Sequence, residues 1–493
     1  MKKSVMNPYL PLWEYVPDGE PRVFEDRLYV YGSHDFAGGE KGFCPGDYMG
    51  WSAPLSDLGS WTCHGVIFSR SQDPALSPAD AMAAPDVVQG PDGRYYLYYN
   101  SNAQWRCVVA VSDRPEGPFD YYGCIQNADG TPFEEFKMFD PGVLADDDGR
   151  IYLYVGFCMT GPVPERFKGM ASPFKETSIG FELAPDMKTI LRGPVPILPG
   201  GNVTAGTGFE GHGFYEASSP RKIGGTYVMV YSSEKSHDLA YALADAPLGP
   251  YTYAGVLVSN ADLGLDGNQT AVMPYGNTHG GLVKLGEDWY VFYHRQTHGI
   301  ECCRQGCAEK LPHRADGWFG QAEITSCGLN NGPLPAAGSY NACYCCHLTS
   351  PQIKPERLTI RECKRSGEPH IFEEPVGEDE TQSLHYIANI GTGTVVGYKY
   401  FDFNAPQGVE ITLRGSGRVH VDVRLDAPDA PAQCESGIDL EESRDWQSIV
   451  LDLPEITGVH ALYFSFRVQQ PVQFECFSFI PASCGEQTDE ARK

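Results

Sequence analysis

Runs of alternating aromatic and aliphatic residues recur between residues 25 and 293, each directly after a turn containing Asp, Glu or Gly. Alternation with a period of two is typical of a β-strand, so each run predicts a strand that follows a hairpin turn. Helical periodicity is nearly absent, which favours an all-β chain. The five copies of the pattern lie at residues 25–31, 92–98, 148–154, 225–231 and 287–293.

The spacing of these copies indicates an internal repeat. The anchors Tyr29, Tyr96, Tyr152, Tyr227 and Tyr290 are 67, 56, 75 and 63 residues apart. These intervals exceed the roughly 40–50 residues of a common propeller blade, but they leave room for four strands with long loops. We therefore predict a five-bladed β-propeller over residues 1–349.

The chain after residue 349 has a different pattern. Residues 350–379 are charged and rich in proline, which predicts a connecting segment. Short alternating runs then predict a β-sandwich of the jelly-roll type over residues 380–485, followed by a tail at 486–493. The runs occur at residues 394–401, 409–413, 419–423, 461–466 and 474–479.

An ionisable residue lies 10 to 12 positions before every anchor of the repeat. In a propeller, the innermost strand of each blade lines the central channel, so equivalent positions in five blades converge. Any one of these residues alone could be a turn residue, but five at nearly the same offset favour a shared site. They are Asp18, Asp86, Asp140, Glu216 and His279.

Composition narrows the function of such a site. The 493 residues include 37 Lys and Arg against 64 Asp and Glu, a net charge of −27. This charge disfavours a nucleic-acid or membrane-surface partner, because both are anionic. We find no secretion signal and no apolar run long enough to span a bilayer, so we expect a cytoplasmic protein.

The 16 cysteines are then expected to be thiols. One cluster, formed by Cys302, Cys303 and Cys307 with residues 343–347, raises the possibility of zinc. Its spacing fits a zinc site poorly, so buried thiols are the preferred interpretation.

Converging carboxyl groups suit glycoside hydrolysis, in which one carboxylic acid protonates the leaving oxygen and one carboxylate activates water. A third carboxylate nearby raises the pKa of the acid by repulsion between like charges. If a water molecule fits between the base and the sugar, the anomeric configuration inverts.

The motifs around these carboxyl groups resemble glycoside hydrolase family 43 over about residues 1–345. They are Pro17-Asp18-Gly19-Glu20-Pro21, Ala84-Pro85-Asp86-Val87, Asp140-Pro141-Gly142-Val143, Tyr215-Glu216-Ala217-Ser218 and His279-Gly280-Gly281-Leu282-Val283. The resemblance implies a five-bladed propeller that releases arabinofuranose or xylose from plant-derived oligosaccharides with inversion. Endo-arabinanase activity and a non-catalytic carbohydrate-binding propeller are the alternatives.

The same resemblance implies roles for individual residues. Asp18 would be the general base, Glu216 the general acid, and Asp140 the carboxylate that orients and tunes them. His279 matches an axial histidine often found near a calcium ion or water, although no cofactor is required for the reaction. Asp86 and Arg295 would bind the substrate. The oligomeric state is left open.

Sugar sites also need aromatic faces, and Trp51, Phe36 and Phe157 are candidates because they lie in or near inner-strand regions. Residues 380–481 resemble a family 6-type carbohydrate-binding module. A sandwich with a purely structural role is the alternative there.

Overall fold

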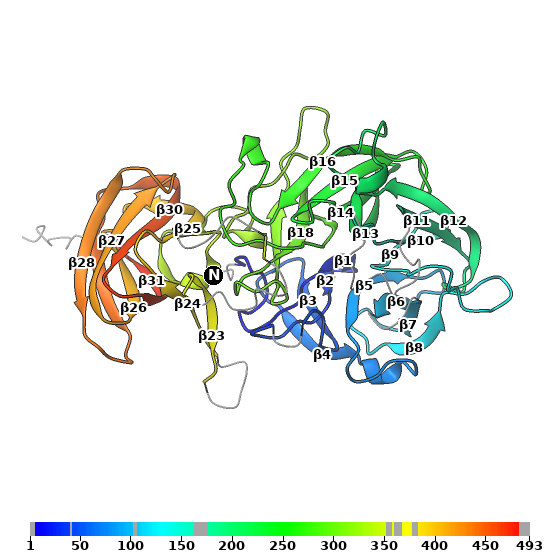
Figure 1. The fold of residues 1–493 in the computed structure, drawn as a ribbon, viewed down its shortest axis with the longest axis horizontal. Helices are drawn as coiled ribbons and strands as arrows, with labels where there is room; N and C mark the ends of the chain where they lie inside the picture. The colour runs from blue at the N-terminus through cyan, green and yellow to red at the C-terminus, as the bar shows by residue number, and fades with distance from the viewer. Residues whose placement is uncertain are drawn as a thin grey trace, which may run out of the picture. The chain divides into compact units, whose positions relative to one another are not determined.

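The computed structural model describes residues 5–39, 42–101, 106–161, 176–351, 357–358, 367–376 and 383–482. The chain divides into two compact units. The first comprises Met1–Ile324 with Pro355–Lys364, and the second Thr325–Lys354 with Arg365–Lys493 (Figure 1). Within the described residues, no helix is both long and apolar enough to cross a bilayer.

The first unit is a five-bladed β-propeller, as predicted. Each blade is an antiparallel sheet whose strands follow one another in sequence (Figure 1). The predicted aromatic runs form the second strand of every blade. The blades are β1 (Glu20–Phe24), β2 (Arg27–Tyr31), β3 (Tyr48–Pro54) and β4 (Thr62–Phe68); β5 (Met82–Gln89), β6 (Tyr95–Ser101), β7 (Cys107–Ser112) and β8 (Asp120–Cys124); β9 (Gly142–Ala145), β10 (Ile151–Val155), β11 (Thr177–Leu183) and β12 (Ile190–Pro199); β13 (Phe214–Ile223), β14 (Thr226–Ser233), β15 (Asp238–Ala244) and β16 (Thr252–Ser259); and β17 (Leu282–Leu285), β18 (Asp288–Arg295) and β19 (Gln305–Lys310).

Burial on both faces explains why the second strands are so aromatic. In β6, Tyr95, Leu97 and Tyr99 pack toward the first blade. Tyr96 and Tyr98, on the opposite face of the strand, pack toward the third blade. Because successive side chains of a strand point to opposite faces, large residues at every position fill the gaps between blades.

The first strand of each blade is the innermost one. Strand β1 contacts β5 and β17, and β9 contacts β5 and β13. The ring is closed by the N-terminal segment, which joins the last blade. There, the Asn7 side chain donates to the Ala308 carbonyl (3.0 Å) and Tyr9 N donates to the Gly306 carbonyl (3.1 Å).

The second unit is a β-sandwich, also as predicted, and it consists of two sheets. Its core is aromatic, with Phe477 in contact with Tyr398, Phe464 and Phe474. One sheet contains β20 (Leu334–Pro335), β22 (His347–Thr349), β25 (Val395–Asn404), β27 (Gly417–Leu425), β28 (Ala432–Leu440) and β30 (Thr457–Val468). The other contains β21 (Gly338–Asn341), β23 (His370–Glu374), β24 (Leu384–Ile390), β26 (Gly408–Arg414), β29 (Gln447–Asp452) and β31 (Val472–Ile480).

The boundary between the units lies at Ile324, not at residue 349 as expected. Residues 334–349 belong to the sandwich because β21 pairs with β31 and β22 pairs with β25. Part of the expected linker, 370–374, is strand β23. The predicted tail at 486–493 lies outside the described residues. Short 3₁₀ helices occur at Arg70–Gln72, Gly201–Val203, Leu265–Gly267, Gly328–Asn330 and Ala342–Tyr344.

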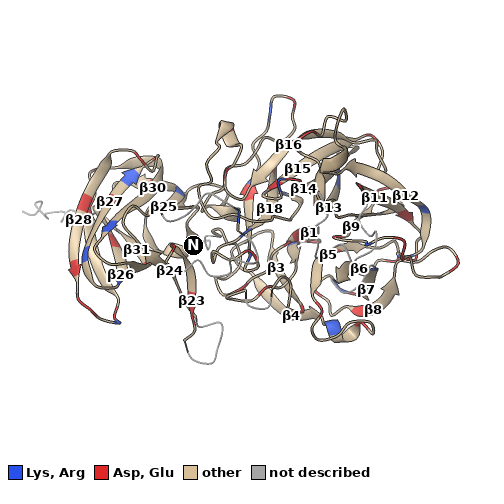
Figure 2. Ribbon diagram, in the orientation of Figure 1, with Lys and Arg blue, Asp and Glu red and all other residues tan. Residues whose placement is uncertain are grey.

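Charged residues are dispersed over the strands and loops of each unit (Figure 2). All cysteines among the described residues are free thiols. The cysteines considered for zinc fall in different units, because Cys302, Cys303 and Cys307 belong to the propeller and residues 343–347 to the sandwich.

Candidate active site

Asp18 lies directly before β1 and is held on both carboxylate oxygens. Ser33 Oγ donates to Oδ2 (2.6 Å), and Arg304 Nη1 donates to Oδ1 (2.9 Å). Burial alone would raise the pKa of Asp18, but the charge of Arg304 and the hydrogen bond with His294 outweigh it. The pKa of Asp18 is therefore held far below its usual range, and the group is ionised at neutral pH.

Arg304 is a residue of the candidate site that the sequence analysis missed. Besides Asp18, its guanidinium binds Asp35, with Nε donating to Oδ2 at 2.8 Å. It also lies 3.3 Å from the thiol sulfur of Cys44. The guanidinium is nearly fully buried, so these contacts fix it against the carboxylate. Arg304 lies outside the repeated pattern, 286 residues from Asp18, and no motif marks it.

Glu216 lies in β13, where the register with β14 shifts. Burial raises the pKa of Glu216 to about 8, and the negative charges of Asp140 and Asp18 act in the same direction. The carboxyl group is thus protonated at neutral pH while Asp18 is ionised. The different surroundings of the two carboxyl groups shift their pKa values in opposite directions, so that one can act as an acid and the other as a base.

Asp140 and His279 form the third part of the group. The His279 Nδ1 atom is 3.4 Å from Asp140 Oδ2, and Asp140 N donates to Asn100 Oδ1 at 3.1 Å. Burial opposes the charge on His279, but the hydrogen bond and charge of Asp140 outweigh it and raise the pKa of His279 to about 9. Burial also raises the pKa of Asp140, whose negative charge acts on Glu216.

The structure separates Asp86 from this group. Its carboxylate pairs with Arg22 (Nη2 to Oδ2, 2.6 Å) and accepts from Val143 N (2.8 Å). The backbone shows why: Asp18, Ala84 and Asp140 share a left-handed conformation, with φ of 57°, 24° and 44°. Ala84 is therefore the equivalent of the two acids, and Asp86 lies two residues further along the inner strand. The motifs Ala84-Pro85-Asp86 and Asp140-Pro141-Gly142 already contained this alignment.

Asp86 instead belongs to a buried ionic network that joins the inner strands. Arg22 lies between Asp86 and Glu20, and Glu20 also binds Arg221 and accepts from Ser219 Oγ at 2.9 Å. The network thus links residues of the first, second and fourth blades through paired charges.

Replacing Asp86 by Ala is expected to act on stability more than on substrate binding. It leaves the buried Arg22 without its main partner, which costs about 3–5 kcal/mol of unfolding free energy. Chemical denaturation measures this loss, and Asp148→Ala, which removes an exposed ion pair with Arg150, is the matched control. A normal unfolding free energy with a strongly raised KM would instead return Asp86 to the substrate site.

Arg295 does not occupy the predicted sugar-contacting position. It is 1% exposed, and its Nε donates to Cys307 Sγ at 3.0 Å inside the fifth blade. Arg304, nine residues later, is the arginine that reaches the carboxyl group.

The three predicted aromatic platforms differ in their surroundings. Phe157 is half-buried and contacts Phe139 and Tyr215, with ring centroids 5.1 and 5.0 Å away. Those two rings immediately precede Asp140 and Glu216 in sequence, so this aromatic cluster borders the site.

Phe36 and Trp51 belong to a second aromatic group in the propeller. Half-buried Phe36 packs edge-on against His34 at 5.2 Å. Trp51 is buried, and its Nε1 donates to Glu14 Oε2 (2.8 Å). It therefore supports its neighbour, the more exposed Trp13, whose ring lies 5.8 Å away.

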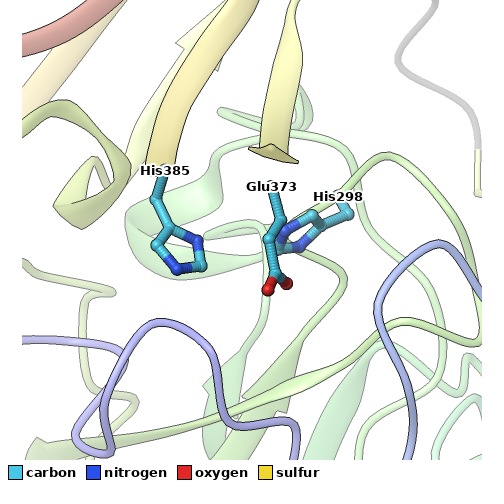
Figure 3. A group of neighbouring side chains, drawn as sticks. All are labelled: His298, Glu373 and His385. Carbon is cyan, nitrogen blue, oxygen red and sulfur yellow. The ribbon is translucent and has the colours of Figure 1, made fainter. Parts of the chain in front are cut away.

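Figure 3 draws three side chains of types that can bind a metal ion, which we describe unit by unit. Glu373 and His385 lie opposite one another on the paired strands β23 and β24 of the sandwich. His298 belongs to the propeller, where its Nε2 lies 3.1 Å from the Tyr15 hydroxyl. Two ligands in one unit are fewer than a zinc or calcium site requires.

The sandwich contains a depression of about 430 Å³ lined in part by Tyr386, Arg414 and Gln473. The Arg414 guanidinium lies over the rings of Tyr386 (5.1 Å) and Trp446 (4.5 Å). These contacts occupy aromatic surface that a sugar ring would need. The expected carbohydrate-binding role of this unit stays a prediction.

A propeller that brings together an ionised Asp, a protonated Glu and a third carboxyl group is typical of a glycoside hydrolase. Comparison with known proteins identifies the family: the model of glycosyl hydrolases family 43 matches residues 25–319. The chain belongs to this family and acts on O-glycosyl bonds. The expected resemblance of the propeller is confirmed.

Individual relatives agree with this family assignment. A xylosidase/arabinosidase of Thermoclostridium stercorarium is 40% identical and covers 97% of this chain and 99% of its own length. A xylosidase/arabinosidase of Bacteroides ovatus is 32% identical over 58% of this chain and 87% of its own. Among solved structures, a family 43 β-xylosidase/α-arabinofuranosidase from a compost microbial metagenome, in complex with xylotriose and calcium-free, is 28% identical. It covers 65% of this chain and 98% of its own, with a TM-score of 0.52.

Proposed function

We propose that this enzyme releases xylose or arabinofuranose from plant-derived oligosaccharides and inverts the anomeric configuration. The opposite protonation of Asp18 and Glu216 carries the proposal, because glycoside hydrolysis needs one ionised and one protonated carboxyl group. Inversion, with Asp18 as the general base, is what membership of family 43 implies. The names of the relatives support the choice of sugars.

Asp18 accepts a proton from a water molecule as the water oxygen attacks the anomeric carbon. Glu216 gives its proton to the glycosidic oxygen as the bond to that carbon breaks. The products are the free sugar and the rest of the oligosaccharide, which leaves as an alcohol. Asp18 ends protonated and Glu216 ionised, so atoms and charge balance. Burial, together with the negative charge of Asp140, keeps Glu216 protonated. Arg304 fixes the orientation of Asp18.

The structural calcium ion that the resemblance allows on the propeller axis fits these residues poorly. The His279 Nδ1 atom faces Asp140 Oδ2 at 3.4 Å, so this ring nitrogen already has a protein partner. Arg22 and Arg221 add positive charge around Glu20, which begins β1 two residues after Asp18. The steps above need only carboxyl groups and water.

The test is hydrolysis of 4-nitrophenyl β-D-xyloside and 4-nitrophenyl α-L-arabinofuranoside. We expect release of nitrophenol from at least one, and NMR should show the anomer opposite to that of the substrate as the first product. Retention would contradict the proposed mechanism. Release from neither, with hydrolysis of linear arabinan, would favour the endo-acting alternative.

We also propose that the enzyme works in the cytoplasm on short oligosaccharides, which enter cells more readily than polymers do. The free thiols of the described cysteines fit a reducing compartment.

A further inference from the structure

His294 contacts the main chain of the proposed base directly. It lies in β18 of the last blade, and its side chain is fully buried. The Asp18 amide N donates to His294 Nδ1 at 3.1 Å, and the same nitrogen lies 3.3 Å from Asp18 Oδ1. Arg304 binds the carboxylate of Asp18. His294 therefore adds a separate contact, made to the backbone of the same residue.

The contact made by His294 recurs at other junctions between blades. In each case, a polar side chain four residues after the tyrosine anchor of one blade accepts a hydrogen bond from the amide of a left-handed residue at the inner strand of the next blade. The pairs, accepting residue first, are Ser33 with Ala84 (2.8 Å), Asn100 with Asp140 (3.1 Å) and His294 with Asp18 (3.1 Å). Two of the three donors are carboxylic acids of the candidate site, so this contact helps to place them.

The backbone of Asp18 explains why such a contact matters. Its φ of 57° is in the left-handed region, which residues other than glycine adopt only where the surrounding structure supports it. Rotation about φ moves the Cβ atom, and with it the carboxylate, relative to the amide. An acceptor fixed against the amide therefore limits the directions in which the carboxylate can point.

The state of the imidazole ring agrees with this role. Burial lowers the pKa of His294 and outweighs the opposing effect of Asp18, so the ring is neutral at neutral pH. Because Nδ1 accepts a hydrogen bond, the proton lies on Nε2. The Nε2 atom is buried and has no hydrogen-bond partner among the described residues. Stability alone would favour a side chain without this donor, because an unpaired buried donor costs free energy.

We propose that His294 is a positioning residue, which fixes the backbone of Asp18 and thereby aims its carboxylate at the attacking water. The inference rests on the proposed function, in which Asp18 is the base. His294 acts through Asp18 and exchanges no proton with the substrate. Arg304 holds the carboxylate and His294 holds the main chain, so two residues that flank the last blade's β18–β19 connection together orient the base.

The experiment compares three variants of His294. His294→Leu removes the acceptor, His294→Asn keeps one on Cγ as Nδ1 is, and His294→Gln moves it one carbon further away. We expect kcat of His294→Leu on the 4-nitrophenyl glycoside to fall about 10- to 100-fold with little change in KM, since a small displacement of a reacting group has an effect of this size. His294→Asn should keep most of the wild-type kcat, and His294→Gln should not. If His294→Leu does not fold, the Asn and Gln variants give the same comparison.

The leaving group distinguishes a displaced base from general damage to the site. The loss in His294→Leu should be equally large on the 2,4-dinitrophenyl glycoside, because the base acts on water and not on the leaving oxygen. The basic limb of the pH profile, which reports Glu216, should stay near pH 8. Tyr293→Phe removes a buried hydrogen bond to Glu309 (3.1 Å) from the same strand, so it controls for lost stability and should keep the wild-type kcat.

Three results would overturn the proposal: a wild-type kcat in His294→Leu, an equal loss in His294→Asn, or a loss that shrinks on the better leaving group. Inactivity of the wild type on both nitrophenyl glycosides would instead count against the proposed function. Crystal structures of wild type and His294→Leu then still test the contact. Asp18 should leave its left-handed conformation in the variant, and an unchanged backbone there would overturn the inference.

Discussion

Glu216→Gln is expected to lower kcat/KM on the 4-nitrophenyl glycoside by about 100-fold or more, because Gln has no proton to give the leaving oxygen. The loss should shrink on a 2,4-dinitrophenyl glycoside, whose leaving group needs less protonation. Steady-state kinetics on the two substrates measures both effects.

The pH profile gives the same residue a second signature. Glu216 must be protonated to act, so wild-type kcat/KM should fall as pH rises through about 8, where this buried group ionises. Glu216→Gln should lose that limb. Glu210→Gln alters an exposed carboxyl group on the loop before β13 and serves as the control. Full activity in Glu216→Gln would show that another group supplies the proton.

Asp18→Asn is expected to lower kcat by about 100- to 10,000-fold, the usual range for a general base. Asparagine keeps the shape of the side chain but cannot accept the proton of the attacking water. Sodium azide, which brings its own nucleophile, should restore part of the turnover. Product analysis and kinetics with and without azide measure the effect.

Stability must be followed in the same variant, because Asp18 pairs with the buried Arg304. Arg304 retains Asp35, so the fold should persist with a lowered melting temperature. Activity close to that of the wild type would remove Asp18 from the base role.

The repeat revealed the propeller because its physical cause is local. The second strand of each blade buries both of its faces, so residues 95–99 are all large. This pattern can be recognised in the amino-acid sequence. The same offset from the anchors also singled out Asp18, Asp140 and Glu216, whose charges act on one another in the structure. Asp86 was misplaced because a constant offset from an anchor ignores bulges. Pro85 and Pro141 indicate the correct alignment, in which Ala84 corresponds to Asp140.

Residues that act through tertiary contacts left no signal. Arg304 contacts Asp18 from outside the repeat, and nothing in its local sequence distinguishes it from a surface arginine. The unit boundary was misplaced for a similar reason. Residues 338–349 pair with β25 and β31, which are far away in sequence.

Closure of the ring by Asn7 and Tyr9 has a consequence for synthesis on the ribosome. Their partners, Gly306 and Ala308, emerge about 300 residues later. Arg304, which holds Asp18 in place, emerges at nearly the same time. A nascent chain carrying four complete blades therefore has the base without its cation and an open ring. We therefore expect activity and closure of the ring to arise together, once the last blade has been made.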